Sequence, residues 1–269
     1  MKIKIGLAQY KVIRSAPEEN LLQIEAYARE AASTGLDLLF LPEMATTGFD
    51  WNYNKQQSED EVNLVLNQLK ELSKIHEVAI CGSFLYKEGS ELPTNTLFYI
   101  NAKGALLGKY HKMHLFTYVG EERHMLAGDT VTSIDTEFGK MGCSICYDLR
   151  FPELFRRCLD QGALFQALPS AFPHPRLEHW QTLVRARAIE NQFFMIATNQ
   201  CGPEALNDDH VETYYFGHSM VVDPWGAILL EADEAAGLYT CEIDLEAVTR
   251  IRSKLTATRD RKLGVDKPS

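Results

Sequence analysis

Residues 142–153 read GCSICYDLRFPE, and in this stretch an apolar strand gives way to a helix. Pro152 and Glu153 are typical of a helix start. Cys146 lies at the junction, so we expect its thiol to be exposed at the strand end, where helix-terminal N–H groups favour the thiolate. The stretch predicts an α/β fold with a reactive cysteine at one edge of a sheet.

The segments before this junction alternate between strands and helices. Polar and apolar residues alternate over 2–10, which predicts a strand, and a helix is predicted to begin near Pro17. Residues 37–42 form a continuous apolar run, typical of a strand buried on both faces. A helix over 60–76 and a strand over 78–84 complete a β-α-β-α-β order.

Hairpins follow this first half. Strands predicted over 96–100 and 106–110 form one hairpin, and strands over 132–137 and 140–146 form another. No linker rich in proline, serine or glycine divides the chain, so we expect one domain of mixed sheets with helices outside, over residues 1–269. The remaining predicted elements are helices over 152–161 and about 177–192, and strands over 194–199 and 218–222.

The composition is that of an ordinary globular protein. The 269 residues are 45% hydrophobic and 24% charged, and the formal net charge is −10. Because no basic block is present, we expect no nucleic-acid partner. The tail from about residue 250 is polar and basic, and it is expected to pack on a partner subunit or to be loose.

The sequence also bears on the cellular compartment. The N-terminus lacks the pattern of a signal peptide, and no run approaches the roughly 20 apolar residues of a membrane span, so no membrane association is expected. Six cysteines are too sparse for a disulfide scaffold. A reducing cytoplasm fits this cysteine content best.

Two further polar side chains follow apolar runs. Glu43 comes directly after residues 37–42, where a partly buried carboxylate suits general-base chemistry. Lys112 follows the strand over 106–110, where an ammonium can stabilise an oxyanion. Each residue alone has an ordinary alternative: a loop acid, a solvated lysine, or a core cysteine in the case of Cys146. Together they suggest covalent catalysis by cysteine.

Cys143 and Cys146 form a C-x-x-C pair, which raises zinc or dithiol redox chemistry as an alternative. In a strand, side chains three residues apart point to opposite faces, so the two sulfurs would diverge. The chain has no second C-x-x-C and no well-placed histidine pair, and His111 and His114 are more typical of structural hydrogen bonding. We therefore expect no metal.

Three segments resemble the signatures of the nitrilase (carbon–nitrogen hydrolase) superfamily: residues 41–43 (LPE), 112–116 (KMHLF) and 146–153 (CYDLRFPE). They occur in the order and at the approximate spacing of the family. The resemblance extends over nearly the whole chain, through residues 93–96, 179–180, 185–191, 217–219 and 223–226.

This resemblance implies an α-β-β-α sandwich whose subunits pair through outer helices, as a homodimer or higher homo-oligomer. It also implies that Glu43 is the general base, Cys146 the nucleophile, and Lys112 the group that stabilises the tetrahedral intermediate. The family's second glutamate falls on Glu121, with Glu122 as an alternative because loop lengths vary. No metal or organic cofactor is implied.

Within the superfamily, residues 46–50, 146–150 and 170–180 resemble bacterial omega-amidases, which hydrolyse 2-oxoglutaramate and 2-oxosuccinamate. Such substrates carry a carboxylate, which Arg176 would bind. The alternative is an ion pair between Arg176 and Glu178. The other residues expected to contact substrate are Phe49, Phe172 and Tyr147.

Other functions remain open at this stage. A different small amide, such as a carbamoyl amine or deaminated glutathione, would use the same catalytic groups. Acyl transfer to an amine is also compatible with them. The alternative from another class is a non-catalytic scaffold, although the three catalytic positions are intact.

Overall fold

A computed structural model describes residues 1–205 and 212–262. Its first six-stranded sheet has the order β14-β1-β2-β3-β4-β5. Strands β1, β2 and β3 are parallel, and β14, β4 and β5 run antiparallel to their neighbours. The strand bounds are β1 Lys2–Gln9, β2 Leu38–Phe40, β3 Ala79–Tyr86, β4 Thr94–Ile100, β5 Leu106–His111 and β14 Gly237–Asp244.

The second six-stranded sheet has the order β13-β12-β9-β8-β7-β6, with β7, β8 and β9 parallel. A separate two-stranded sheet is formed by β10 and β11. The strand bounds are β6 Ser133–Thr136, β7 Gly139–Cys143, β8 Phe165–Ser170, β9 Phe194–Asn199, β10 Cys201–Ala205, β11 Glu212–Phe216, β12 Met220–Val222 and β13 Ile228–Glu231.

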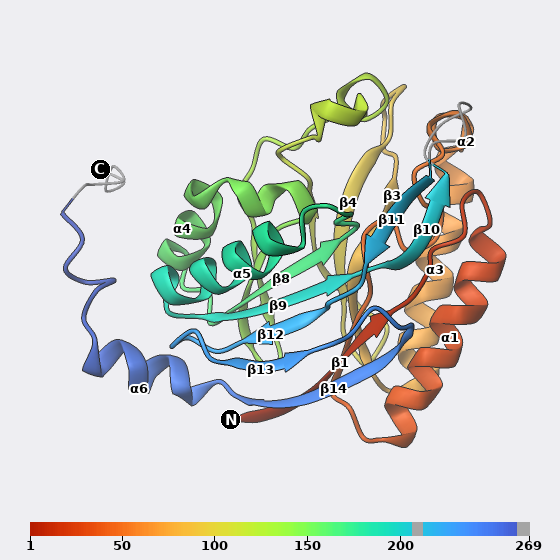
Figure 1. Ribbon diagram of the computed structural model, residues 1–269. Coiled ribbons are helices and arrows are strands. Elements are labelled where there is room, and N and C mark those ends of the chain that lie inside the picture. Colours follow the sequence, from red (N-terminus) through yellow and green to blue (C-terminus); the bar gives the residue numbers. More distant parts are fainter. Residues whose placement is uncertain (206–211, 263–269) are drawn as a thin grey trace.

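Helices cover the outer face of each large sheet (Figure 1). Helices α1 (Pro17–Ser33) and α3 (Glu59–His76) pack on the first sheet, and α4 (Pro152–Asp160) and α5 (Leu177–Asn191) pack on the second. The predicted α-β-β-α sandwich is confirmed. The remaining helices are α2 Trp51–Gln56, α6 Glu246–Lys254 and the 3₁₀ helices η1 Thr117–Val119, η2 Glu121–Arg123 and η3 Cys146–Arg150.

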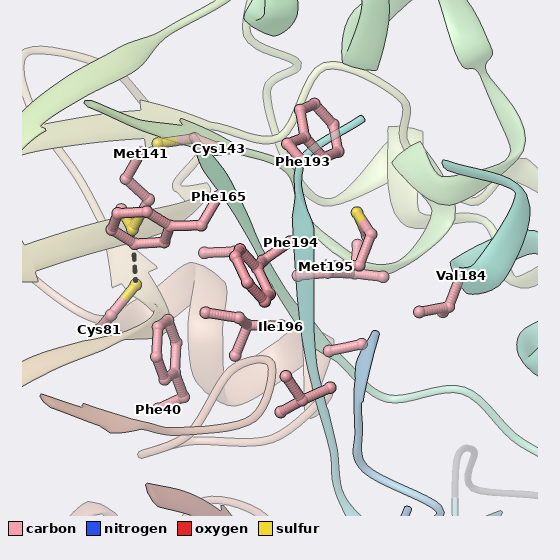
Figure 2. Packing of buried hydrophobic residues seen from close by; sticks show 14 of the residues in the cluster. Phe40, Cys81, Met141, Cys143, Phe165, Val184, Phe193, Phe194, Met195 and Ile196 are labelled. Atoms are coloured by element: carbon pink, nitrogen blue, oxygen red, sulfur yellow. Dashed lines mark hydrogen bonds between the residues drawn. The ribbon is translucent and has the colours of Figure 1, made fainter. Parts of the chain in front are cut away.

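Alternation along β2 shows how the layers pack. Leu38 and Phe40 point into the core between the sheets, whereas Leu39 belongs to the core beneath α1 and α3. In Figure 2, Phe40 and Cys81 of the first sheet face residues of the second sheet, and the Cys81 Sγ lies 4.0 Å from the Met141 Sδ. A strand buried on both faces lacks polar positions, which explains the continuous apolar run.

Strand β7 is shorter than predicted. The sequence pattern extends the strand to Cys146, but β7 ends at Cys143, and η3 begins at Cys146 with a φ of 45°. A left-handed backbone is unfavourable for any residue with a Cβ. Cys146 therefore lies in the turn that follows the strand and not in the strand itself.

The polar tail begins as an ordered helix. Residues 250–254 complete α6, and the Arg252 guanidinium donates to the carbonyls of Gln192 and Ala163. Arg261 forms an ion pair of 2.8 Å with Asp160. The described part of the tail therefore packs on its own chain, while residues 263–269 lie outside the described residues. Over 1–205 and 212–262, no helix is long and apolar enough to cross a bilayer.

Candidate active site

A cavity of about 470 Å³ opens where β2, β5, β7 and β8 end. Its lining includes all four predicted catalytic residues: Glu43, Lys112, Glu121 and Cys146. The first sheet and its loops carry Glu43 and Lys112, whereas the turn after β7 of the second sheet carries Cys146. The cavity is thus assembled from the ends of both sheets.

The Glu43 carboxylate is buried, with 1% of the residue exposed. Its Oε1 accepts hydrogen bonds of 2.8 Å from the Asn95 Nδ2 and the Lys112 Nζ, and its Oε2 accepts one of 3.0 Å from the backbone N–H of Ala171. Burial raises the pKa of Glu43, although the charge of Lys112 opposes the rise. This carboxylate is both oriented and a stronger base than an exposed glutamate.

The Lys112 ammonium is held between two carboxylates. Its Nζ lies 2.8 Å from the Glu43 Oε1 and 2.9 Å from the Glu121 Oε2. Burial by itself lowers the pKa of Lys112, but the charges of Glu121 and Glu43 outweigh it and hold that pKa well above the ordinary lysine value. Lys112 is therefore a permanent cation in the cavity.

Glu121 begins η2 and is buried, and its Oε2 also accepts a hydrogen bond of 2.6 Å from the Phe116 backbone. The side chain of Glu122 instead points outward, where it pairs with Arg123 at 3.5 Å. Of the two glutamates left open by the sequence, the structure places Glu121 against Lys112.

Cys146 begins η3 and is the cysteine that lines the cavity. Burial raises the pKa of its thiol well above the ordinary value, and the negative charge of Glu43 raises it further. Lys112 and the Ala171 N–H have the opposite, smaller effect. The expectation of an exposed thiol is wrong, because Cys146 is only 8% exposed, and this burial raises the pKa of the thiol more than the nearby N–H group lowers it.

The C-x-x-C pair does not form a joint site. Cys143 is fully buried in the core between the sheets, whereas Cys146 reaches the cavity. In the part of the chain that the structure describes, no group of three histidine, cysteine, aspartate or glutamate side chains is placed to hold a metal ion.

Two of the four predicted substrate contacts line the cavity. Phe49 forms part of its wall, and the Arg176 guanidinium lies 5.8 Å from the ring centre of Phe116 and 5.6 Å from that of Tyr118. Among the described residues, Arg176 forms no ion pair with Glu178, the alternative partner left open by the sequence.

Phe172 and Tyr147, the other two predicted contacts, are not among the described residues that line the cavity. Phe172 packs in the core, with its ring centre 5.4 Å from that of Trp180. Tyr147 lies behind the wall, with its ring centre 4.8 Å from that of Phe116. Both residues directly follow lining residues, Ala171 and Cys146, and adjacent side chains point in different directions.

Other contributing residues were not predicted from the sequence. Trp51, at the start of α2, and Tyr118 line the cavity, and Asn95 and Ala171 orient Glu43. Asn95 lies in the segment 93–96 that carries the family resemblance, which is the one signal that could have identified it. Ala171 contributes through its backbone N–H, a group that nearly every residue has, so its residue type does not indicate this role.

The chain matches the carbon–nitrogen hydrolase family over residues 4–253. It is 33% identical to a 2-oxoglutaramate amidase of Bacillus subtilis, over 97% of this chain and 98% of the relative. It is 30% identical to a deaminated glutathione amidase of Dictyostelium discoideum, over 97% of this chain and 94% of the relative.

A solved structure agrees with these relationships. The fold is similar to that of Saccharomyces cerevisiae Nit3, a member of branch 10 of the nitrilase superfamily, with a TM-score of 0.87 and 29% identity over 97% of each chain. The chain belongs to the carbon–nitrogen hydrolase family, within the nitrilase superfamily, and is an enzyme that acts on a linear amide.

Proposed function

We propose that this carbon–nitrogen hydrolase converts the terminal amide of a short 2-oxo acid, such as 2-oxoglutaramate or 2-oxosuccinamate, to a carboxylate and ammonia. The observation that carries the proposal is the joint placement of Cys146, Glu43 and Lys112 in one cavity. The similarity to a 2-oxoglutaramate amidase supports the substrate class.

In the acylation half-reaction, Glu43 accepts the thiol proton as the Cys146 sulfur attacks the amide carbon. Lys112 and the backbone N–H of Tyr147 stabilise the oxyanion of the tetrahedral intermediate. Protonated Glu43 then gives its proton to the leaving nitrogen as the C–N bond breaks. Ammonia leaves, and the acyl group remains as a thioester on Cys146.

In the deacylation half-reaction, Glu43 accepts a proton from a water molecule that attacks the thioester carbon. The second tetrahedral intermediate collapses, the C–S bond breaks, and the sulfur recovers a proton from Glu43. The Glu121 carboxylate accepts hydrogen bonds from Lys112 and positions its ammonium beside Glu43, where it can stabilise the oxyanion. No redox step is needed.

The remote carboxylate of the substrate binds Arg176 in this proposal. Arg176 lines the cavity, and its guanidinium lies over Phe116 and Tyr118, which restrict its position. A guanidinium can bind a carboxylate through two parallel hydrogen bonds. Phe49 provides an apolar wall for the methylene groups between the two ends of the substrate.

Steady-state kinetics with 2-oxoglutaramate test this role. Arg176→Ala is expected to raise KM about 10-fold or more, the effect of losing a charge-assisted pair of about 1.5–3 kcal/mol. Arg157→Ala, an exposed arginine on α4, is the matched control and should leave KM unchanged. An unchanged KM in Arg176→Ala would rule out this carboxylate site.

The size of the cavity favours a second candidate. A volume of about 470 Å³ exceeds what a five-carbon amide fills and lies in the range of sites for larger ligands. Deaminated glutathione, the substrate named for one relative, would occupy more of it. Comparing kcat/KM for the two amides decides between them, with Cys146→Ala as the control that abolishes both.

The proposal extends to the setting of the enzyme. All six cysteines are free thiols, which supports a reducing cytoplasm. Ile189 on α5 and Trp225 in the β12–β13 turn are exposed apolar residues. Pairing of two copies as a homodimer would bury these side chains, and their exposure in the single chain supports such a dimer. Sedimentation velocity should give the mass of two chains, and a single-chain mass would exclude the dimer.

A further inference from the structure

Asp148 is a fully buried carboxylate that the mechanism above does not use. It lies in η3, two residues after Cys146. Its Oδ2 accepts hydrogen bonds of 2.8 Å from the Tyr110 hydroxyl and from the Ile145 backbone. Its Oδ1 accepts bonds of 3.0 Å from the His114 backbone and 2.7 Å from the His114 Nδ1.

Asp148 and its donors flank the two reacting residues along the chain. Tyr110 and His114 lie two residues before and two residues after Lys112. Ile145 and Asp148 itself lie on either side of Cys146. One carboxylate thus joins the segment that carries the ammonium to the turn that carries the thiol, across the two sheets.

Neighbouring contacts reinforce this link. The Tyr110 hydroxyl, which donates to Asp148, also accepts a hydrogen bond of 3.2 Å from the Met113 backbone. The His114 ring stacks on Phe151, with ring centres 3.7 Å apart and planes within 6°. The residues on both sides of Lys112 are therefore fixed, although the Lys112 side chain never touches Asp148.

We propose that Asp148 is a positioning residue that fixes the Lys112 ammonium relative to the Cys146 sulfur. The inference rests on the proposed function, because it assumes that these two groups react together. Its physical basis is that a fully buried carboxylate with four donors tolerates little displacement, since a buried N–H that loses its acceptor is costly to leave unpaired. Cys146 is held in a left-handed conformation that needs such support.

Asp148→Asn tests the proposal with almost no change in volume. The amide nitrogen of asparagine cannot accept a hydrogen bond, so at least one backbone N–H, of Ile145 or His114, loses its acceptor. We expect kcat for ammonia release to fall about 100-fold, the size typical of a displacement near 1 Å, with KM within about twofold. Asp223→Asn is the matched control.

Asp223 also accepts backbone hydrogen bonds, from Trp225 and Ala227, but it lies in the β12–β13 turn and does not line the cavity. The same Asp→Asn change there should leave kcat unchanged. Comparable losses in both variants would point to general destabilisation and overturn the positioning role.

The pH profile of Cys146 alkylation by iodoacetamide separates positioning from charge. Glu43 and Lys112 are the charged groups that face Cys146, and Tyr110 and His114 are the titratable groups that face Asp148. Removing a nearby negative charge by itself would shift the profile to lower pH. Displacing the Lys112 cation would shift it to higher pH, which is the result we expect.

Alkylation needs no amide substrate, so it tests the position of Lys112 even if the proposed substrate is wrong. Should Asp148→Asn fail to fold, Tyr110→Phe removes one donor from the same carboxylate and should shift the profile in the same direction by a smaller amount. An unchanged profile, or a shift to lower pH, in a folded variant would overturn the proposal.

Discussion

Two buried carboxylates contact one ammonium in the cavity, and this arrangement influences which groups of the site carry a proton. Lys112 stays charged because Glu43 and Glu121 both contact it at 3.0 Å or less. Burial raises the pKa of the nearby Cys146 thiol, and the negative charge of Glu43 raises it further. The proposed mechanism starts from a Glu43 carboxylate and a Cys146 thiol, between which a proton is transferred as the sulfur attacks.

Glu43→Gln removes the proposed base and keeps the side-chain size. We expect kcat to fall about 10³-fold, within the range for loss of general acid–base catalysis, while the protein stays folded. Ammonia release measured beside far-UV circular dichroism checks both points. Glu122→Gln, on the exposed neighbour of Glu121, should keep full activity. A Glu43→Gln enzyme that retained a tenth of the wild-type rate would exclude the general-base role.

The rate should depend on pH in a bell-shaped manner. Activity requires an ionised Glu43 and a protonated Cys146. As pH falls, protonation of Glu43 removes the base, and burial places this acid limb above the ordinary glutamate pKa of 4.5. As pH rises, the thiol loses the proton that Glu43 would pass to the leaving nitrogen. Burial raises the pKa of this thiol, so the alkaline limb lies above the ordinary thiol pKa of 9.0. An acid limb of kcat/KM below 4.5 would contradict this assignment.

At the residue scale, the sequence predicted the groups that react better than those that contact substrate. Glu43, Lys112 and Cys146 each end an apolar run, so strand periodicity placed them at one edge. Whether Phe172 or its neighbour Ala171 faces the cavity depends on the backbone path after β8, which periodicity does not define. The raised pKa of the Cys146 thiol results from its burial by segments that are distant in the sequence.

Strand ends and the loops after them orient the reacting groups. The Asn199 side chain, at the end of β9, accepts a hydrogen bond of 2.7 Å from the Phe172 N–H and donates one of 3.1 Å to the Phe172 carbonyl. This fixes the loop after β8, whose Ala171 N–H donates to Glu43. Parallel neighbours β8 and β9 thereby support a carboxylate that belongs to the other sheet.

Close packing of β3 against Leu41 also helps to fix the position of Glu43, in addition to the loop after β8. A Cβ at Gly82 would lie 2.7 Å from the Leu41 Cβ, two residues before Glu43. Gly82→Ala should therefore lower the free energy of unfolding by about 1–3 kcal/mol and reduce kcat about 10-fold or more. At Gly237 in β14, the nearest atom is 3.5 Å from such a Cβ.

Gly237→Ala is therefore the matched control, and urea denaturation beside ammonia release compares the two variants. We expect Gly237→Ala to stay within about 0.5 kcal/mol of the wild type. Equal effects of both substitutions would show that close approach of β3 to Leu41 is not what orients Glu43.

The long elements that were predicted lie within one or two residues of their observed ends where a clear period meets a chemical start or stop signal, whereas β14 and α6 were not predicted. Helix α3 begins with a capping box between Ser58 and Glu61, and β9 coincides with its predicted range. Helix α2, with six residues, and the β10–β11 pair were not predicted. Such short elements depend on contacts made by the rest of the fold rather than on periodicity.

At the scale of the whole molecule, the cavity exists only when the two large sheets are packed together. Glu43 and Lys112 come from the first sheet, and Cys146 and Ala171 from the second. Their inner faces share one hydrophobic cluster, which also includes Trp180 of α5. The first sheet alone would hold a carboxylate–ammonium pair without a nucleophile, and the second alone would hold a cysteine without its base.

We propose that the chain is a single domain, which predicts one cooperative unfolding transition. The core between the sheets is continuous, so neither half keeps its apolar face covered without the other. Urea curves from tryptophan fluorescence and far-UV circular dichroism should coincide. Two separate midpoints would indicate halves that unfold independently.

The most direct test of the account is ammonia release from 2-oxoglutaramate, measured for the wild type and for Cys146→Ala. We predict release by the wild type and none above background by the variant, together with loss of the acyl adduct on Cys146 seen by mass spectrometry after rapid quenching. Release that survives in a folded Cys146→Ala enzyme would contradict covalent catalysis by this thiol.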